Sequence, residues 1–126
     1  MRKAAKIIST AASVAVLFGS MAFMPATSSA AESKSMSPVE QGKAIAFNRK
    51  KGNCLACHQM DDGNMPGNIG PPLVAMKSRY PNKAALRAQI WDATKINPNS
   101  VMPPFGRNHI LTEDEIDKVV DFVWTL

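Results

Sequence analysis

Cys54, Cys57 and His58 are the residues of this chain whose types and spacing best suit chemistry. Two cysteines separated by two residues lie about one helical turn apart, so each thiol can add to one of the two vinyl groups on a haem edge. The histidine follows directly, and its imidazole can reach the iron from the same turn. The stretch therefore predicts covalent attachment of one haem c, with His58 as an axial iron ligand.

Three other uses of these residues account for the pattern less well. A zinc site would have to add His109 to His58 and the cysteines, but one histidine adjoins a cysteine and the other lies far along the chain. That spacing is unlike a zinc finger. A thioredoxin-like redox pair needs a βαβ setting, and a structural disulfide leaves the histidine without a role.

The start of the chain has the three regions of a secretory signal peptide. Met1–Lys6 is basic, Ile7–Phe23 is mostly apolar, and small residues lead to expected cleavage after Ala30 or Ala31. Polar residues interrupt the apolar run, which makes a membrane anchor the weaker interpretation. We expect residues 1–31 to be removed on export to the periplasm, residues 32–36 to form a flexible tether, and residues 37–126 to form the functional domain.

Removal of this leader changes what the charge implies. The chain of 126 residues has 15 Lys and Arg against 10 Asp and Glu, a formal net charge of +5. Three of the basic residues and none of the acidic ones lie in the leader, so the mature charge is +2. Two haem propionates would bring it close to neutral, and nothing in the composition points to nucleic acid. About 95 residues remain, which suffices for one domain with a modest core.

Helices are expected at both ends of this domain. Ser37 as N-cap and Glu40 three positions later predict a capping box, with Arg49–Lys51 ending that helix where its dipole favours cations. Thr112 and Glu115 predict a second capping box at the last helix. Its apolar residues repeat at the spacing of one helix face: Ile116, Val119, Val120, Val123 and Trp124.

The first and last helices should cross each other, with Gly42 and Phe47 at the contact. A further helix is predicted from Asn82 as N-cap to about Thr94. Trp91 on that helix is expected to form a wall of the haem pocket. Because no stretch of comparable length has strand periodicity, we predict an all-α fold.

An irregular segment rich in glycine, proline and asparagine, residues 61–72, is expected to wrap the haem. It ends in Gly70-Pro71-Pro72-Leu73, which resembles the Gly-Pro-x-Leu pattern of small cytochromes c. In that family the proline carbonyl accepts the free ring N–H of the proximal histidine. The resemblance implies that Pro71 orients His58 and fixes its tautomer. An ordinary Gly-Pro turn is the other interpretation.

Met102 is the methionine that the same resemblance favours as the second axial ligand, because small cytochromes c place theirs between the middle helix and the last one. Pro103 and Pro104 follow it and stiffen the backbone. A methionine is more often core filler than a ligand, and His109 is a reserve ligand. The other thioether donors of the mature chain are Met36, Met60, Met65 and Met76.

Most of the mature chain, about residues 37–126, resembles SoxX, the small monohaem cytochrome c subunit of the SoxAX complex of bacterial thiosulfate oxidation. This resemblance rests on an ordered set of motifs, since the haem pentapeptide alone would match any cytochrome c. The motifs are Gly52–His58, Pro66–Leu73, Arg79–Pro81, Ile90–Thr94, Met102–Arg107 and Ile110–Thr112.

The resemblance to SoxX implies an electron-transfer subunit of an L-cysteine S-thiosulfotransferase complex, which couples thiosulfate oxidatively to a cysteine of a carrier protein. In that family the sulfur chemistry takes place at a haem of the larger SoxA subunit, so this chain alone is not expected to be catalytic. Its partners would be a SoxA-like subunit and a downstream electron acceptor. Neither nucleic acid nor stable membrane insertion after cleavage is expected.

We expect the haem edge near Cys54 and the Met102 loop to face the larger subunit, with Arg49–Lys51 at a salt-sensitive rim. The apolar candidates for the centre of that interface are Pro66, Ile69, Pro103, Pro104 and Phe105. Two other functions stay open. A free electron shuttle would share every haem residue, and a haem enzyme or gas sensor would follow if Met102 were not a ligand.

Overall fold

A computed structural model describes residues 35–126, in which helices and irregular segments occur and no strand is present. The helices are α1 (Pro38–Phe47), α2 (Met76–Arg79), α3 (Lys83–Trp91) and α4 (Glu113–Val123), with short 3₁₀ turns η1 (Cys54–Ala56) and η2 (Ala93–Lys95). The predicted all-α class is confirmed. The predicted leader and residues 32–34 of the predicted tether lie outside the described residues, so the domain boundaries stay a prediction.

Both predicted capping boxes are present, and they determine where α1 and α4 begin. The amide of Glu40 donates to Ser37 Oγ at 3.3 Å, and the amide of Ser37 donates back to Glu40 Oε2 at 2.7 Å. Thr112 and Glu115 exchange the same pair of hydrogen bonds at 3.2 and 3.1 Å. Each box satisfies backbone donors that a helix start otherwise leaves without partners.

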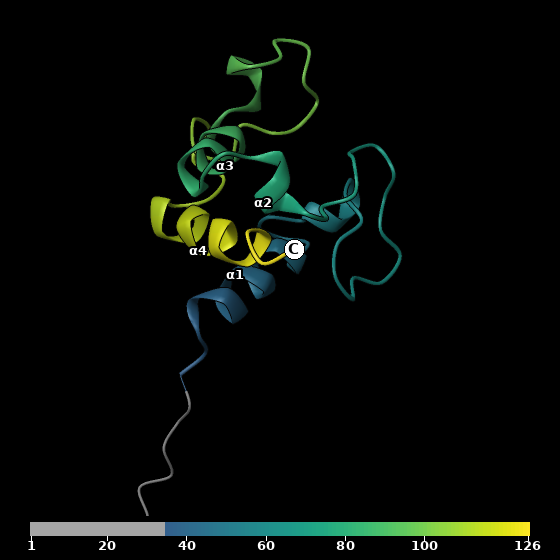
Figure 1. Cartoon of the computed structure of the whole chain (residues 1–126), viewed down its shortest axis with the longest axis vertical. Helices are drawn as coiled ribbons and strands as arrows, with labels where there is room; N and C mark the ends of the chain where they lie inside the picture. The colour runs from purple at the N-terminus through teal and green to yellow at the C-terminus, as the bar shows by residue number, and fades with distance from the viewer. Residues whose placement is uncertain (1–34) are drawn as a thin grey trace, which may run out of the picture. The chain divides into compact units, whose positions relative to one another are not determined.

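α1 and α4 cross in close contact, and they have the most extensive contact of any two elements in the described residues (Figure 1). A Cβ on Gly42 would lie 1.9 Å from the carbonyl oxygen of Lys118, so only glycine lets the two backbones approach this closely. The rings of Phe47 and Phe122 meet edge to face, 6.0 Å apart. The predicted crossing is confirmed, and Gly42 lies against Lys118 and Phe122 of α4.

The core lies between α4 and the elements on either side of it. Five residues of α4 are buried: Ile116, Val119, Val120, Phe122 and Val123. Leu86 and Ile90 of α3 are buried in the same cluster, while Trp124 is half-buried just beyond the end of α4. Each large buried side chain contributes about 1.5–3 kcal/mol, which makes this cluster the main support of the helices.

Two helices end earlier than their sequence patterns predict. α1 stops at Phe47 because Asn48 turns extended, and its side chain accepts from the amide of Lys50 at 2.8 Å. The basic residues 49–51 therefore lie in a turn after α1 and not in its last turn. α3 stops at Trp91 and not near Thr94, because the Trp91 carbonyl accepts from Gly106 and Arg107 across the chain.

None of the helices in residues 35–126 has both the length and the apolar content needed to span a membrane.

The close approach at Gly42 gives a stability prediction. Gly42→Val should lower the free energy of unfolding by about 3 kcal/mol, the upper end of the overpacking range, because the backbones of α1 and α4 must separate. Ala44→Val is the matched control, since Ala44 is exposed on the same helix and should cost less than about 1 kcal/mol. Denaturant unfolding of the two variants measures both values. Equal midpoints for Gly42→Val and the parent would contradict the crossing.

Candidate functional site

A cavity of about 650 Å³ lies between the Cys54–His58 turn, α3, α4 and the segment 97–105. Both cysteines, His58 and Met102 line it, so the structure brings the four predicted iron- and haem-binding residues to one space. The deeper walls are apolar and include Met76, Leu86, Ile90, Phe105, Val119 and Val123. Pockets that bind cofactors and small molecules have volumes of roughly 300–1,000 Å³.

The Cys54–His58 turn is held by the glycine-rich segment that follows it. Gly67 N–H donates to the Leu55 carbonyl and Gly70 N–H to the Cys57 carbonyl, both at 2.8 Å, and Leu73 N–H donates to the Gln59 carbonyl at 2.8 Å. A Cβ on Gly67 would lie 1.9 Å from the Ala56 carbonyl oxygen. This pairing needs a residue without a side chain, which explains the glycine content of the segment.

His58 has one ring nitrogen fixed by the same segment. Its Nδ1 lies 2.8 Å from the Pro71 carbonyl oxygen. Because a carbonyl can only accept, Nδ1 carries the proton and the lone pair belongs to Nε2. A Cβ on Gly70 would lie 2.3 Å from Cε1 of the ring, so Gly70 lets the imidazole pack directly on the backbone.

Cys54 and Cys57 are both free thiols in the described residues, although they are neighbours on one turn. Burial raises the pKa of the Cys54 thiol to about 11, and the nearby Cys57 adds to the increase. The Cys54 thiol is therefore neutral at physiological pH. A neutral thiol is a weaker nucleophile and metal ligand than a thiolate.

The methionines occupy different places around the cavity. Met102 is half-buried and lines it, as the ligand prediction requires. Met76 is fully buried and also lines it, a position that the sequence argument missed. Met60 is buried away from the cavity lining, and Met65 is 78% exposed. His109, the reserve ligand, is exposed and is not among the lining residues.

The structure differs from one sequence prediction about the cavity wall and from one of the five candidates for the partner interface. Trp91 does not line it, because its ring packs against Gly106 and under the guanidinium of Arg87. Phe105 was expected at the centre of a protein interface, but it is only 6% exposed and belongs to the inner wall. Both aromatic residues pack within the fold, a distinction that their position in the sequence does not reveal.

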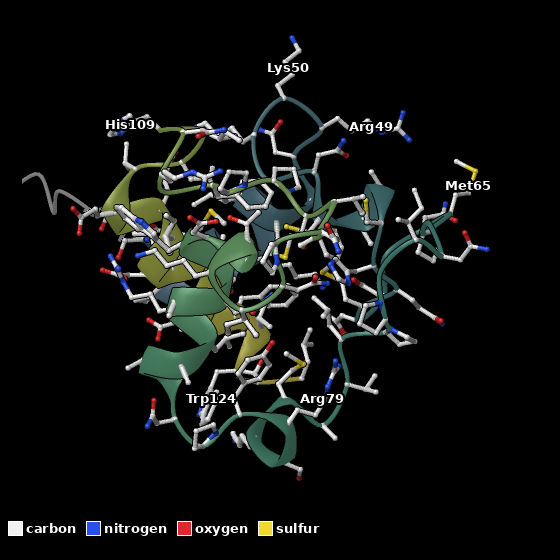
Figure 2. The ribbon with its side chains drawn as sticks, turned by 90° about the horizontal axis from the view of Figure 1, so that it is seen from above. Arg49, Lys50, Met65, Arg79, His109 and Trp124 are labelled. Carbon is white, nitrogen blue, oxygen red and sulfur yellow. The ribbon has the colours of Figure 1, made fainter. Side chains whose placement is uncertain are left out.

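The rim of the cavity is basic and apolar. Arg49, Lys50, Lys51 and Arg79 line the cavity, and no acidic residue does among the described residues. Lys51 is paired with Glu115, whereas Figure 2 shows Arg49 and Lys50 extending away from the body of the molecule. The exposed apolar residues that line the rim are Ile69, Val101, Pro103 and Ile110.

Arg79 lines the cavity and also supports the backbone next to His58. Its Nη1 donates to the Pro72 carbonyl at 2.7 Å and lies 3.6 Å from Met76 Sδ. The carbonyl of Pro71, next to this anchored position, is the one that faces His58 Nδ1. Arg79 belongs to the Arg79–Pro81 motif, which contributes to the resemblance to SoxX but did not predict a role for the arginine.

These observations fit a haem. The cavity offers an apolar interior for a flat macrocycle, two neighbouring free thiols, an imidazole with an available Nε2, and cations at the rim for propionates. Compared with known protein families, residues 39–126 match the family described as Cytochrome c. The chain belongs to the cytochrome c family. It carries one covalently bound haem c, and electron transfer is the activity of this cytochrome.

Comparison with solved structures relates this cytochrome to one particular assembly. The crystal structure of SoxXA from P. pantotrophus contains a chain that is 30% identical, with a TM-score of 0.62, over 68% of this chain and 79% of that chain. This protein is thus a SoxX-like monohaem cytochrome. An uncharacterized lipoprotein of Aquifex aeolicus (strain VF5) is 35% identical over 75 residues, which are 59% of this chain and 36% of that protein. The chain thus spans about a third of the length of that curated relative.

Covalent attachment can be tested directly on the cytochrome. Acid–acetone treatment of the denatured holoprotein should leave the haem on the chain, because thioether bonds to Cys54 and Cys57 survive unfolding. A double variant, Cys54→Ala with Cys57→Ala, should release any haem it binds. The measurement is the haem absorbance in the acetone phase. Extractable haem from the unmutated protein would contradict attachment.

Proposed function

We propose that this cytochrome is the electron-carrying subunit of a SoxAX-like complex, which oxidatively couples thiosulfate to a cysteine of a carrier protein. The observation that carries this proposal is the 30% identity to a chain of SoxXA over 79% of that chain's length. The ordered motifs of the sequence support it independently. We further propose a periplasmic location, which the predicted leader and the description of the Aquifex relative as a lipoprotein support.

In this proposal Cys54 and Cys57 would hold the haem through thioether bonds, and His58 and Met102 would bind its iron. The Pro71 carbonyl holds the His58 ring by its Nδ1–H, so Nε2 keeps one orientation in both oxidation states. Haem c, when bound, accepts and releases one electron at its iron. A methionine ligand is expected to raise the reduction potential relative to a bis-histidine site, which suits a carrier that receives electrons.

The residues of this chain favour carrying electrons over performing the sulfur chemistry. The chain has two cysteines, and both are committed to the thioether bonds, so none remains to form a persulfide. With His58 and Met102 as ligands, the iron has no open position for a substrate. The covalent step with thiosulfate therefore belongs to the larger partner subunit in this proposal, and the role of the chain is to remove electrons.

We place the partner on the rim of the cavity. Ile69 is 69% exposed and Val101 is 79% exposed, and both line the cavity beside Pro103 and Ile110. Exposed apolar side chains gathered at one opening suit an interface centre better than the buried Phe105. Arg49 and Lys50 have no ion-pair partner within residues 35–126, so they can face acidic groups of the partner at the edge.

Ligation by Met102 gives a spectroscopic prediction. Met102→Ala should abolish the near-infrared sulfur-to-iron charge-transfer band of the ferric protein and let added imidazole bind. Met65→Ala is the control, because the Met65 side chain is 78% exposed and does not line the cavity. A band that persists in the Met102 variant would show that another methionine is the ligand.

The interface gives a second prediction. Val101→Asp should weaken binding to the larger cytochrome at least about tenfold at any ionic strength, as expected for a residue near an interface centre. Val74→Asp is the matched control, since Val74 is 57% exposed but does not line the cavity. Surface plasmon resonance with the purified partner measures both affinities. Equal weakening by the two variants would place the interface elsewhere.

Charge reversal separates the rim from the centre. Arg49→Glu combined with Lys50→Glu should slow association mainly at low salt, whereas Lys77→Glu on α2 should not.

The thiosulfate role itself is tested by copurification from native extract. A cytochrome that transfers electrons normally but never associates with a larger haem protein would be a free electron shuttle.

A further inference from the structure

The segment that carries Met102 leaves and rejoins the fold at one point. Asp92 stands at its start, directly after α3, and Arg107 at its end. Arg107 Nη1 lies 3.0 Å from Asp92 Oδ2, and Asp92 is only 2% exposed. The residues between these two, with η2, the Asn97–Ser100 turn and Met102, therefore form a loop closed at its base by an ion pair.

Thr94 completes this closure. Its amide and hydroxyl donate to Asp92 Oδ1 at 3.1 and 2.5 Å, and its Oγ1 also accepts from Arg107 Nη1 at 3.1 Å. We call Asp92, Thr94 and Arg107 the clasp. The Trp91 carbonyl adds two backbone bonds at the same place, from Gly106 at 3.1 Å and Arg107 at 3.4 Å. Hydrogen bonds from Thr94 and the charge of Arg107 lower the pKa of Asp92, so its carboxylate is charged at neutral pH.

Beyond the clasp the loop has few other anchors. Within residues 35–126, every hydrogen bond made by residues 96–103 joins them to another residue of the same loop, such as Met102 N–H to Ser100 Oγ at 3.2 Å. Ile96 and Val101 are 72% and 79% exposed. Figure 1 shows this loop extending away from the helices. Hydrogen bonds therefore fix this loop only at its base, while the buried Phe105 and the packing of Met102 against the core add apolar contacts.

The ion pair of the clasp differs from the other ion pairs of the described residues in burial. The Asp92 side chain is 2% exposed, whereas the remaining acidic partners are 17–75% exposed. Exposed pairs have little effect on stability. Removing Arg107 would leave the buried Asp92 carboxylate with only its two hydrogen bonds from Thr94, which is unfavourable for the closed state.

We propose that the clasp is a positioning device that keeps the Met102 thioether in the cavity, so that breaking it opens the loop while the rest of the fold persists. The inference rests on Met102 as a ligand, one part of the proposed function. It does not depend on thiosulfate or on any partner. Asp92, Thr94 and Arg107 act in it through the loop and touch no reacting atom.

Arg107→Gln in the holoprotein tests the clasp. The variant should bind added imidazole at the ferric iron about ten- to a hundredfold more tightly than the parent, the factor for losing one hydrogen bond to a buried charge. Its sulfur-to-iron band should weaken on warming below the unfolding temperature. Lys83→Gln is the control, because it breaks the Lys83–Asp121 pair between α3 and α4 and should leave both values unchanged. Arg107→Lys should restore part of the parent behaviour.

The double variant Asp92→Asn with Arg107→Gln removes the buried charge together with its partner, so it should bind imidazole less tightly than Arg107→Gln alone. If Arg107→Gln does not fold, Thr94→Val replaces it, with a smaller increase expected. Unchanged imidazole affinity in a folded clasp variant overturns the proposal. Persistence of the band in Met102→Ala would instead show that the ligand assignment is wrong, so the two failures are distinguishable.

Discussion

The backbone pairing between the Cys54–His58 turn and the segment Gly67–Leu73 is the constraint on which the site depends. Three amide-to-carbonyl hydrogen bonds of 2.8 Å hold the two segments together. The same pairing puts the Pro71 carbonyl beside His58 and makes glycine necessary at positions 67 and 70. A single local contact thereby decides the ring tautomer, the path of the irregular loop and one side of the cavity.

The ion pairs of the described residues contribute little to stability, apart from the pair made by the buried Asp92. Most ion pairs lie at the surface, where water screens them and each is worth about 0–1 kcal/mol. Lys43 between Asp61 and Asp62 is an example, since it links α1 to the irregular loop at an exposed position. Asp92 is the buried exception, and it stands at the base of the Met102 loop. At the cavity rim, Arg49 and Lys50 have no ion-pair partner among residues 35–126, which suits anionic groups of a cofactor or partner.

Sequence patterns predicted the helix starts, which depend on residues close together in the chain. The capping boxes at Ser37 and Thr112 involve residues three positions apart, so their starts follow from the sequence alone. The ends of α1 and α3 were missed because a side chain of Asn48 and a distant amide of Gly106 decide them. Burial of Phe105 depends on which face of its loop turns inward, and the placement of Trp91 depends on the packing of its ring against Gly106. Neither follows from the local sequence.

The cavity also has a consequence for the chain before haem is attached. Without haem, the buried apolar walls of this open cavity would meet water and lose part of their hydrophobic stabilisation. A chain that never received its prosthetic group must therefore flood, collapse or unfold locally around residues 61–73 and 96–105. Proteases cleave such opened segments preferentially. The haem thus supplies the redox centre and also covers the apolar walls of the cavity.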